Sequence, residues 1–298
     1  MKMRLISALL AAPALISLCL VFTPSASAGE LENQLISAAK SGDVAGIQAA
    51  LDRGANIEAT DNDGQTALMQ AARWGHADAV KLLLEKGANV KSTDKNGTTA
   101  LLCAAPNGSA DMVKLLLEKG SDIEAKDDDG YTALMNAAIK GSADVVKLLL
   151  DNGANIEAKN RDGKTALMFA FKFGNVDVVN ILLKKLIKLV QAMGPPPKIP
   201  AEAKRDFIKG NTFILQGKDA SAAQDAIDAY KDALSLAPWW GNAYFNLGLA
   251  YEAAGRYKEA EESMNFFLLT KPEGAWKNKA EQELGKIEAE EKLESESK

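Results

Sequence analysis

Histidine and cysteine, which carry much of the nucleophilic and metal chemistry of proteins, are almost missing from this chain. Its 298 residues include one histidine, His76, and two cysteines, Cys19 and Cys103. So few groups leave no His-based triad or Cys-His pair to assemble. A glycine-rich loop that could cradle a phosphate is missing as well. These absences argue against an enzyme, and we expect no cofactor.

Blocks of positive charge are also missing. The chain has 35 Lys and Arg against 40 Asp and Glu, a net charge of −5, with no basic block before its tail. Nucleic acid is therefore an unfavourable partner. Hydrophobic residues make up 47% of the chain, which is enough to build a core, and the length favours two domains.

The N-terminus has the three parts of a secretory signal. Lys2 and Arg4 precede an apolar run from Leu5 to Phe22, and the small residues Ala26-Ser27-Ala28 follow. This order predicts a signal peptide at residues 1–28, removed after Ala28, and a periplasmic or secreted protein. The alternative is an uncleaved membrane anchor, although the run is near the lower length limit for spanning.

Cleavage would leave Cys103 as the one remaining cysteine. An intrachain disulfide is then impossible, and the exported fold must depend on apolar packing. A lipoprotein site at Cys19 is disfavoured because Leu18 is larger than the small residue that usually precedes such a cysteine.

One pattern recurs four times, at a constant interval, from Asp61 onwards. Self-similarity at a fixed period of this size is typical of stacked supersecondary units. The copies are 61–93, 94–126, 127–159 and 160–193, and a degenerate copy at 29–60 has the character of a capping repeat. The glycines that mark the period are Gly64, Gly97, Gly130 and Gly163.

Each copy reads as a turn followed by two helices. Asp61-x-x-Gly64 is turn chemistry, Thr66 caps a short helix, and Gly75 ends it. Asp78 then opens a second helix with one apolar face. The core residues expected in this copy are Leu68, Ala71, Ala72, Val80, Leu82 and Leu83.

The motif G-x-T-A-L-x-x-A-A-x-x-G-x-x-D-x-V-x-L-L-L-x-x-G-A-x-I, repeated in register, resembles the ankyrin repeat over about half the chain. The resemblance implies an all-α fold, an ankyrin solenoid of helix pairs with short hairpin loops. The sequence departs from the family at its T-P-L-H box. Alanine replaces proline, and Met69, Leu102, Met135 and Met168 replace histidine, so we expect apolar contacts there.

The resemblance also implies that a protein partner binds the hairpin tips and the concave face formed by the short helices. Carried over by position, these residues are Asn62, Asp63, Gln65, Arg73, Trp74, Lys95, Asn96, Thr98, Pro106, Asn107, Asp128, Asp129, Tyr131, Ile139, Lys140, Arg161, Asp162, Lys164, Lys172 and Phe173. Trp74, Tyr131, Ile139 and Phe173 predict an apolar contact patch on this face. The alternative is that each is an isolated residue or packs against its neighbour.

The last copy lacks the Gly-Ala-Asn ending of the others. Its apolar spacing continues from Val176 to Met193 and predicts one long helix that closes the stack and bridges to the next domain. Lys184, Lys185 and Lys188 on its other side suggest a membrane-surface helix as an alternative. Residues 194–200 are a stiff, proline-rich linker.

Residues 201–274 resemble two tetratricopeptide repeats, which implies a small domain of helical hairpins. Tyr244, Leu247, Gly248, Tyr251, Ala260 and Pro272 carry the resemblance in the second copy. The first copy is looser, with a long turn from Gln216 to Ala223, and residues 275–298 form a capping helix and charged tail. Asn211 and Asn246 lie where some members of that family hold the C-terminal carboxylate of a peptide, although Asn246 is also common there on structural grounds.

Two acidic tips, Asp61 to Gly64 and Asp127 to Gly130, resemble calcium loops. Aligned on the glycine, however, alanine occupies the first ligand position and an amide the last, so we expect no metal. The sequence therefore predicts a non-enzymatic scaffold that binds a protein partner. The alternative is a membrane-tethered adaptor, held by an uncleaved leader or by the basic helix.

Overall fold

Helices dominate the described part of the protein. The computed structural model describes residues 28–193, 197–216 and 220–296. Within these ranges the regular structure consists of helices and two isolated bridges, so the all-α prediction is confirmed. The predicted signal peptide up to residue 27 and residues 194–196 of the predicted linker lie outside the described residues.

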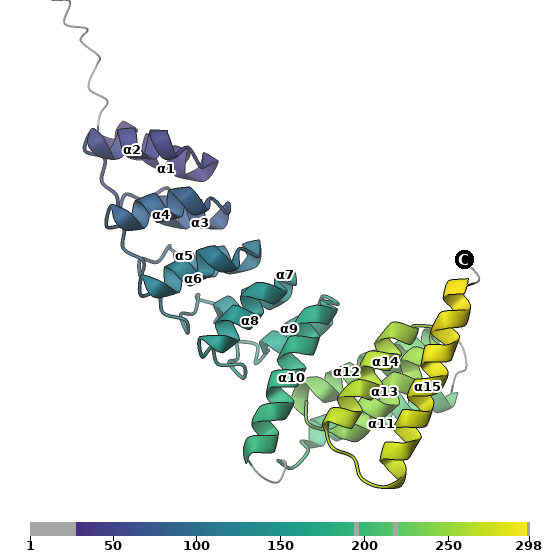
Figure 1. Cartoon of the computed structure of the whole chain (residues 1–298). Helices are drawn as coiled ribbons and strands as arrows, with labels where there is room; N and C mark the ends of the chain where they lie inside the picture. The colour runs from purple at the N-terminus through teal and green to yellow at the C-terminus, as the bar shows by residue number, and fades with distance from the viewer. Residues whose placement is uncertain (1–27, 194–196, 217–219, 297–298) are drawn as a thin grey trace, which may run out of the picture.

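Residues 28–193 form a row of helix pairs, which we call the repeat stack (Figure 1). Each predicted copy supplies one pair. The pairs are α1 (Ala28–Ser41) with α2 (Val44–Asp52), α3 (Ala67–Arg73) with α4 (Ala77–Glu85), α5 (Ala100–Ala104) with α6 (Ala110–Glu118), α7 (Ala133–Lys140) with α8 (Ala143–Asp151), and α9 (Ala166–Lys172) with α10 (Val176–Met193).

Side-chain caps start the short helices where the sequence predicts them. The Thr66 hydroxyl accepts a hydrogen bond from the Met69 amide at 3.3 Å, and Thr99, Thr132 and Thr165 do the same in their repeats. Gly75 ends α3 with a φ of 80°, a left-handed conformation that favours glycine. The second copy differs, because Pro106 follows α5 and the chain continues as the 3₁₀ turn η1 (Ala105–Asn107).

Apolar side chains fill the space between successive pairs. Leu116 in α6 is 0% exposed. Met69, Leu102 and Met135 are also buried, and Met168 is half-buried. These residues therefore make the expected apolar contacts at the position where the ankyrin motif usually has histidine.

Helix α10 has the bounds that the sequence predicts and joins two parts of the molecule. It packs on α8 and α9 through residues such as Leu182 and Leu183, which are buried. It also contacts α14, and the Gln191 amide donates a hydrogen bond to the Leu269 carbonyl at 2.7 Å. Helix α10 thus bridges the stack and the unit that follows it.

The remaining helices form a second unit, the C-terminal bundle (residues 197–296). Its helices are α11 (Ala201–Gln216), α12 (Ala220–Leu236), α13 (Gly241–Ala253), α14 (Tyr257–Leu269) and α15 (Ala275–Glu296). Helix α12 begins at Ala220, so residues 220–223 of the expected long turn are helical. Consecutive helices pack against one another.

Aromatic pairs hold the bundle together. Phe207 lies 4.4 Å from Trp240 and 5.6 Å from Tyr230 between ring centroids. Phe245 contacts Phe267 at 5.3 Å. Offset or edge-on aromatic pairs stabilise a core beyond the area they bury.

The bundle covers one end of the stack. Helix α12 contacts α9, and α14 contacts α10, as Figure 1 shows for the teal and green helices. The bundle leaves the short helices of the earlier repeats uncovered, so the two ends of the stack present different surroundings to a partner.

Candidate functional site

The hairpin tips are loops braced by hydrogen bonds within each tip and between neighbouring tips. In each tip an Asp or Asn side chain accepts two backbone amides; Asp61 Oδ1 accepts from Asp63 and Gln65, both at 2.9 Å. Neighbouring tips are also joined through the backbone, for example from the Lys95 amide to the Asp63 carbonyl at 3.1 Å. The exposed predicted contact residues of the tips are Asn62, Asp63, Lys95, Asn96, Asp128, Asp129, Arg161, Asp162 and Lys164, and Thr98 is half-buried.

Gln65 has a structural position instead of the exposed one that the sequence predicts. It is 8% exposed; its side-chain amide donates to Asp94 Oδ2 at 3.0 Å, and its side-chain oxygen accepts from the Gln70 amide at 3.0 Å. Burial by itself would raise the pKa of Asp94, but hydrogen bonds from the Thr98 amide, Gln65 and the Asn96 amide outweigh it and lower that pKa. We therefore remove Gln65 from the predicted contact surface.

A row of side-chain hydrogen bonds ties each repeat to the one before it. The His76 ring N–H donates to the Lys40 carbonyl at 3.1 Å, and Ser142 donates to the Pro106 carbonyl at 3.3 Å. Asn175 donates to the Ala138 and Ile139 carbonyls. These three donors share one repeat position. Because the T-P-L-H box has lost its histidine, we expected apolar contacts between repeats, and this row of polar links was not predicted.

Asn107 takes part in the same linkage. Its side-chain amide donates to the Ala72 carbonyl at 2.6 Å and to the Arg73 carbonyl at 2.9 Å. The residue is exposed, but its donor groups are committed to the preceding repeat. Sequence position alone did not reveal this role.

The four predicted apolar contact residues do not form one patch of equal exposure. Trp74 is 55% exposed and Phe173 is 50% exposed. Tyr131 and Ile139 are half-buried and pack against the core, with Tyr131 at 5.2 Å from the Phe169 ring. The two exposed rings occupy equivalent positions in the first and fourth full repeats.

Cations flank both exposed rings. Lys40 Nζ lies 5.7 Å from the Trp74 ring centroid and Lys172 Nζ lies 5.5 Å from that of Phe173. Arg73 in α3 and Lys140 in α7 are also exposed, and both helices contribute to the predicted contact face. The inner face of the first three full repeats thus combines an aromatic ring with positive charge.

At the fourth repeat the inner face is bordered by helix α12 of the bundle. A cleft of about 1010 Å³, counted with its open mouth, separates Lys164, Met168 and Lys172 from Asp228 and Asp232 of α12. Burial, together with the neighbouring Asp206 and Asp228 carboxylates, raises the pKa of Asp232. Lys164 and Lys172 therefore face this junction cleft, whereas the sequence placed them on an open surface.

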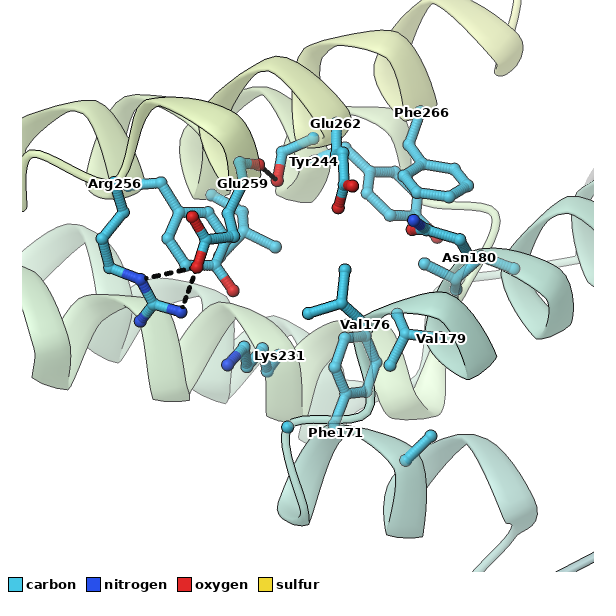
Figure 2. A pocket seen from close by; sticks show the side chains of 16 residues that line it. Phe171, Val176, Val179, Asn180, Lys231, Tyr244, Arg256, Glu259, Glu262 and Phe266 are labelled. Carbon is cyan, nitrogen blue, oxygen red and sulfur yellow. Dashed lines mark hydrogen bonds and ion pairs between the residues drawn. The ribbon is translucent and has the colours of Figure 1, made fainter. Parts of the chain in front are cut away.

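A second hollow, the junction pocket of about 530 Å³ with its mouth, lies between α9–α10 and α12–α14. Figure 2 shows Phe171, Val176 and Val179 on one side and Tyr244 and Phe266 on the other. These apolar residues come from both units, so the pocket lies at the junction between them.

The polar end of the junction pocket is built around Tyr251. Arg256 lies 4.7 Å from the Tyr251 ring centroid and pairs with Glu259 at 2.7 Å (Figure 2). Lys231 Nζ lies 5.7 Å from the same centroid, and burial lowers the pKa of Lys231. Tyr251 was predictable from its repeat position, whereas Lys231 and Arg256 were not predicted as site residues.

A sequence signal for this junction exists. Phe171 occupies the position held by Ala72, Ala105 and Ala138 in the preceding repeats. Those alanines are fully buried between neighbouring repeats. In the described part of the chain, no further repeat covers the fourth full repeat. A large aromatic in the place of a small residue indicates a different neighbour, here the bundle.

The two asparagines predicted to line a peptide groove are brought together by the structure. The Asn246 amide donates to Asn211 Oδ1 at 2.9 Å, and the Tyr230 hydroxyl donates to the same oxygen at 2.7 Å. Both asparagines are half-buried, and burial raises the pKa of Tyr230 to about 12. Their mutual hydrogen bond gives them a structural role; their predicted role in peptide binding stays a prediction.

Cys103 and His76, the cysteine and the histidine of the described residues, both have structural surroundings. Burial raises the pKa of the Cys103 thiol to about 11, so it stays protonated near neutral pH, and His76 is bonded to a backbone carbonyl. Among the described residues, no group of three or more His, Cys, Asp or Glu side chains could hold a metal ion. In the same part of the chain, every helix is too short or too polar to cross a membrane.

Comparison with known proteins identifies the repeats. A family model described as ankyrin repeats (three copies) matches residues 35–127 and 122–192. No curated protein matches this chain.

Proposed function

Because the chain belongs to the ankyrin repeat family, we propose that it is a scaffold that binds a protein partner on the inner face of its repeats. The single observation that carries this proposal is the exposure of Trp74 next to Arg73 and Lys40 on the uncovered part of the stack. Large aromatics and arginine are the residues that dominate binding energy at interfaces. The contact surface extends over the hairpin tips of the first three full repeats.

The bundle limits where the partner can lie. Helix α12 contacts α9, so a partner approaching the fourth repeat meets the wall of the junction cleft. Phe173 and Lys172 then contact the partner's end rather than its middle. The proposed interface is therefore centred on α3, α5 and α7.

We also infer that the bundle is a pair of tetratricopeptide repeats with a capping helix. Gly248 supports this, because an added Cβ would lie 2.9 Å from Met264 of the facing helix. Gly210 faces Tyr230 in the same way in the first hairpin. Helical hairpins packed through a small residue are what the sequence motif implies.

We further propose that the protein is exported. The support is the order of Lys2, Arg4, the apolar run and Ala26-Ser27-Ala28. Intact-mass measurement of the protein from the exported fraction tests this, with Gly29 as the expected first residue. A mass that still includes the segment from Met1 to Ala28 would favour the membrane-tethered adaptor instead.

The binding surface is tested by site-specific photo-crosslinking in the native cell. A photoreactive residue at position 74 is expected to give an adduct with a discrete partner. The matched control is position 276, since Trp276 is 50% exposed on the bundle. An adduct from position 276 and none from 74 would contradict the proposed face.

The strength of binding is tested with the partner that the crosslink identifies. Trp74→Ala is expected to weaken binding at least about tenfold, or 1.4 kcal/mol, while the melting temperature stays within a few degrees. Asn246→Ala should weaken it less. The opposite ranking would assign the working surface to the groove of the bundle.

A further inference from the structure

A basic groove lies on the outer side of the stack, away from the short helices. Lys147 of α8 and Lys184, Lys185 and Lys188 of α10 surround it, and Leu150 and Ile181 line it. The groove has a volume of about 650 Å³ with its mouth, and Asp151 is the one carboxylate in its lining. We refer to it as the basic groove.

The positive charge of this groove breaks the pattern of the repeats. Glu85, Glu118 and Asp151 occupy equivalent positions in the first three full repeats, and the fourth member of that row is Lys184. In the second full repeat, Glu118 pairs with Lys114 at 3.9 Å. In the last repeat, Asn180 replaces the lysine of this pair and Lys184 replaces its acidic residue.

The four lysines of the groove outnumber its one carboxylate, Asp151. None of the four makes a salt bridge or a side-chain hydrogen bond with a residue in the described part of the chain. Yet the chain as a whole is acidic, with a net charge of −5. An occupant that fits the groove carries carboxylates around at least one apolar side chain.

The end of α15 has this chemistry. Leu293 is 66% exposed, and Glu290 and Glu296 lie one helical turn before and after it on the same face. Figure 1 shows this end, in yellow, projecting past α14 on the side of the bundle away from α10. It therefore lies too far from the groove of its own chain to fill it.

We propose that the basic groove binds the acidic end of α15 from a second copy of this chain. Leu293 packs against Leu150 and Ile181, and the two glutamates face Lys184 and Lys188. Groove and helix end are different surfaces, so the contact is heterologous, and copies can add one after another. Separate surfaces are used for this contact and for the partner face at Trp74.

The contact is small and depends on charge. One helical turn in a groove of this size buries less than the roughly 1,200 Å² of a typical stable interface, so association is weak. Exposed charges separated by more than about 8 Å are screened at physiological ionic strength. Association is expected to weaken further as salt is added.

Sedimentation velocity of the chain from Gly29 onwards tests the proposal. At low salt the mean mass is expected to rise above the monomer between about 10 and 500 μM, a range chosen for a weak interface. Lys184→Glu with Lys188→Glu is expected to return the protein to a monomer. Lys81→Glu is the matched control. Lys81 is exposed and occupies, in the first full repeat, the position that Lys147 occupies in the third. This substitution should leave association unchanged.

A charge swap distinguishes self-association from other causes. Glu290→Lys with Glu296→Lys should also be monomeric alone. Mixing it with the Lys184→Glu, Lys188→Glu variant should restore association, because each groove then meets a helix end of opposite charge. Leu293→Ser should weaken association of the otherwise unchanged chain. Thermal melts of all variants check that each is folded.

Three results would overturn the proposal. The first is a monomer at every concentration at low salt, and the second is association that survives the lysine reversal. The third is a mixture that stays monomeric although both variants are folded. Vesicles containing anionic lipid complete the test, because a monomer that binds them only with Lys184 and Lys188 intact would assign the groove to a membrane surface.

Discussion

The repeat stack and the C-terminal bundle are both helical, but they are held together differently. In the stack the same contacts recur from one repeat to the next, such as the backbone bonds between Asp63 and Lys95 and between Asn96 and Asp128. In the bundle many contacts occur once, as in the pair of Phe207 and Trp240. The family match covers the stack alone. Periodic contacts leave a periodic sequence signal, and single contacts do not.

The largest expected effect comes from the centre of the stack. Leu116→Ala removes a side chain that is 0% exposed and should cost roughly 2–5 kcal/mol of unfolding free energy. Because each repeat depends on its neighbours, hydrogen exchange should accelerate in repeats on both sides. Faster exchange confined to α6 would contradict the picture of one cooperative stack.

A change in the bundle should remain more local. The buried Tyr244 hydroxyl donates to the Pro238 carbonyl at 2.7 Å, and Tyr244→Phe leaves that carbonyl without its donor. A cost of about 1–3 kcal/mol is expected. Hydrogen exchange should accelerate in α13 and α14 but not in α3, and equal acceleration in α3 would show that the two units unfold together.

The links between repeats can be tested one at a time. Asn175→Ala removes hydrogen bonds to the Ala138 and Ile139 carbonyls and should cost about 1–2 kcal/mol, measured by chemical denaturation. Asn152→Ala is a suitable control, because that amide bonds only within its own repeat, to the Leu148 carbonyl. Equal effects of the two changes would show that the row does not couple repeats.

The smallest effect concerns pH. The pKa of the Asp94 carboxyl is lowered in the folded protein. The ionised carboxylate therefore stabilises the fold above its unfolded pKa of about 3.9. This stabilisation is lost as the pH falls through the lower folded pKa. Asp94→Asn should cost about 1 kcal/mol near pH 7. The difference from the unchanged protein should shrink below about pH 4.

The turn itself should survive this substitution. Asn160 holds the same position in the fourth repeat and accepts the Asp162 and Lys164 amides at 3.1 and 2.8 Å. A difference that stays constant from pH 7 to pH 3 would show that the charge of Asp94 does not contribute. Denaturant melts across that range make the measurement.

The candidate site was predictable only in part. Tip residues such as Asn62 and Asp128 are exposed as the repeat position implies, because the turn geometry is local. The burial of Gln65 and the bonds of Asn107 were not predictable in this way, since both depend on groups of a neighbouring repeat. Likewise, the half-burial of Tyr131 depends on Phe169.

The sequence by itself determined the period, the caps and the long closing helix from Val176 to Met193. Each of these follows from short-range requirements, namely a glycine at positive φ, a threonine hydroxyl within reach of an amide, and apolar residues on one helix face. Only the tertiary structure decided that the bundle covers the fourth repeat and that lysines gather over Leu150. Those features join helices distant in the chain, such as α9 and α12, and no local pattern specifies such a contact.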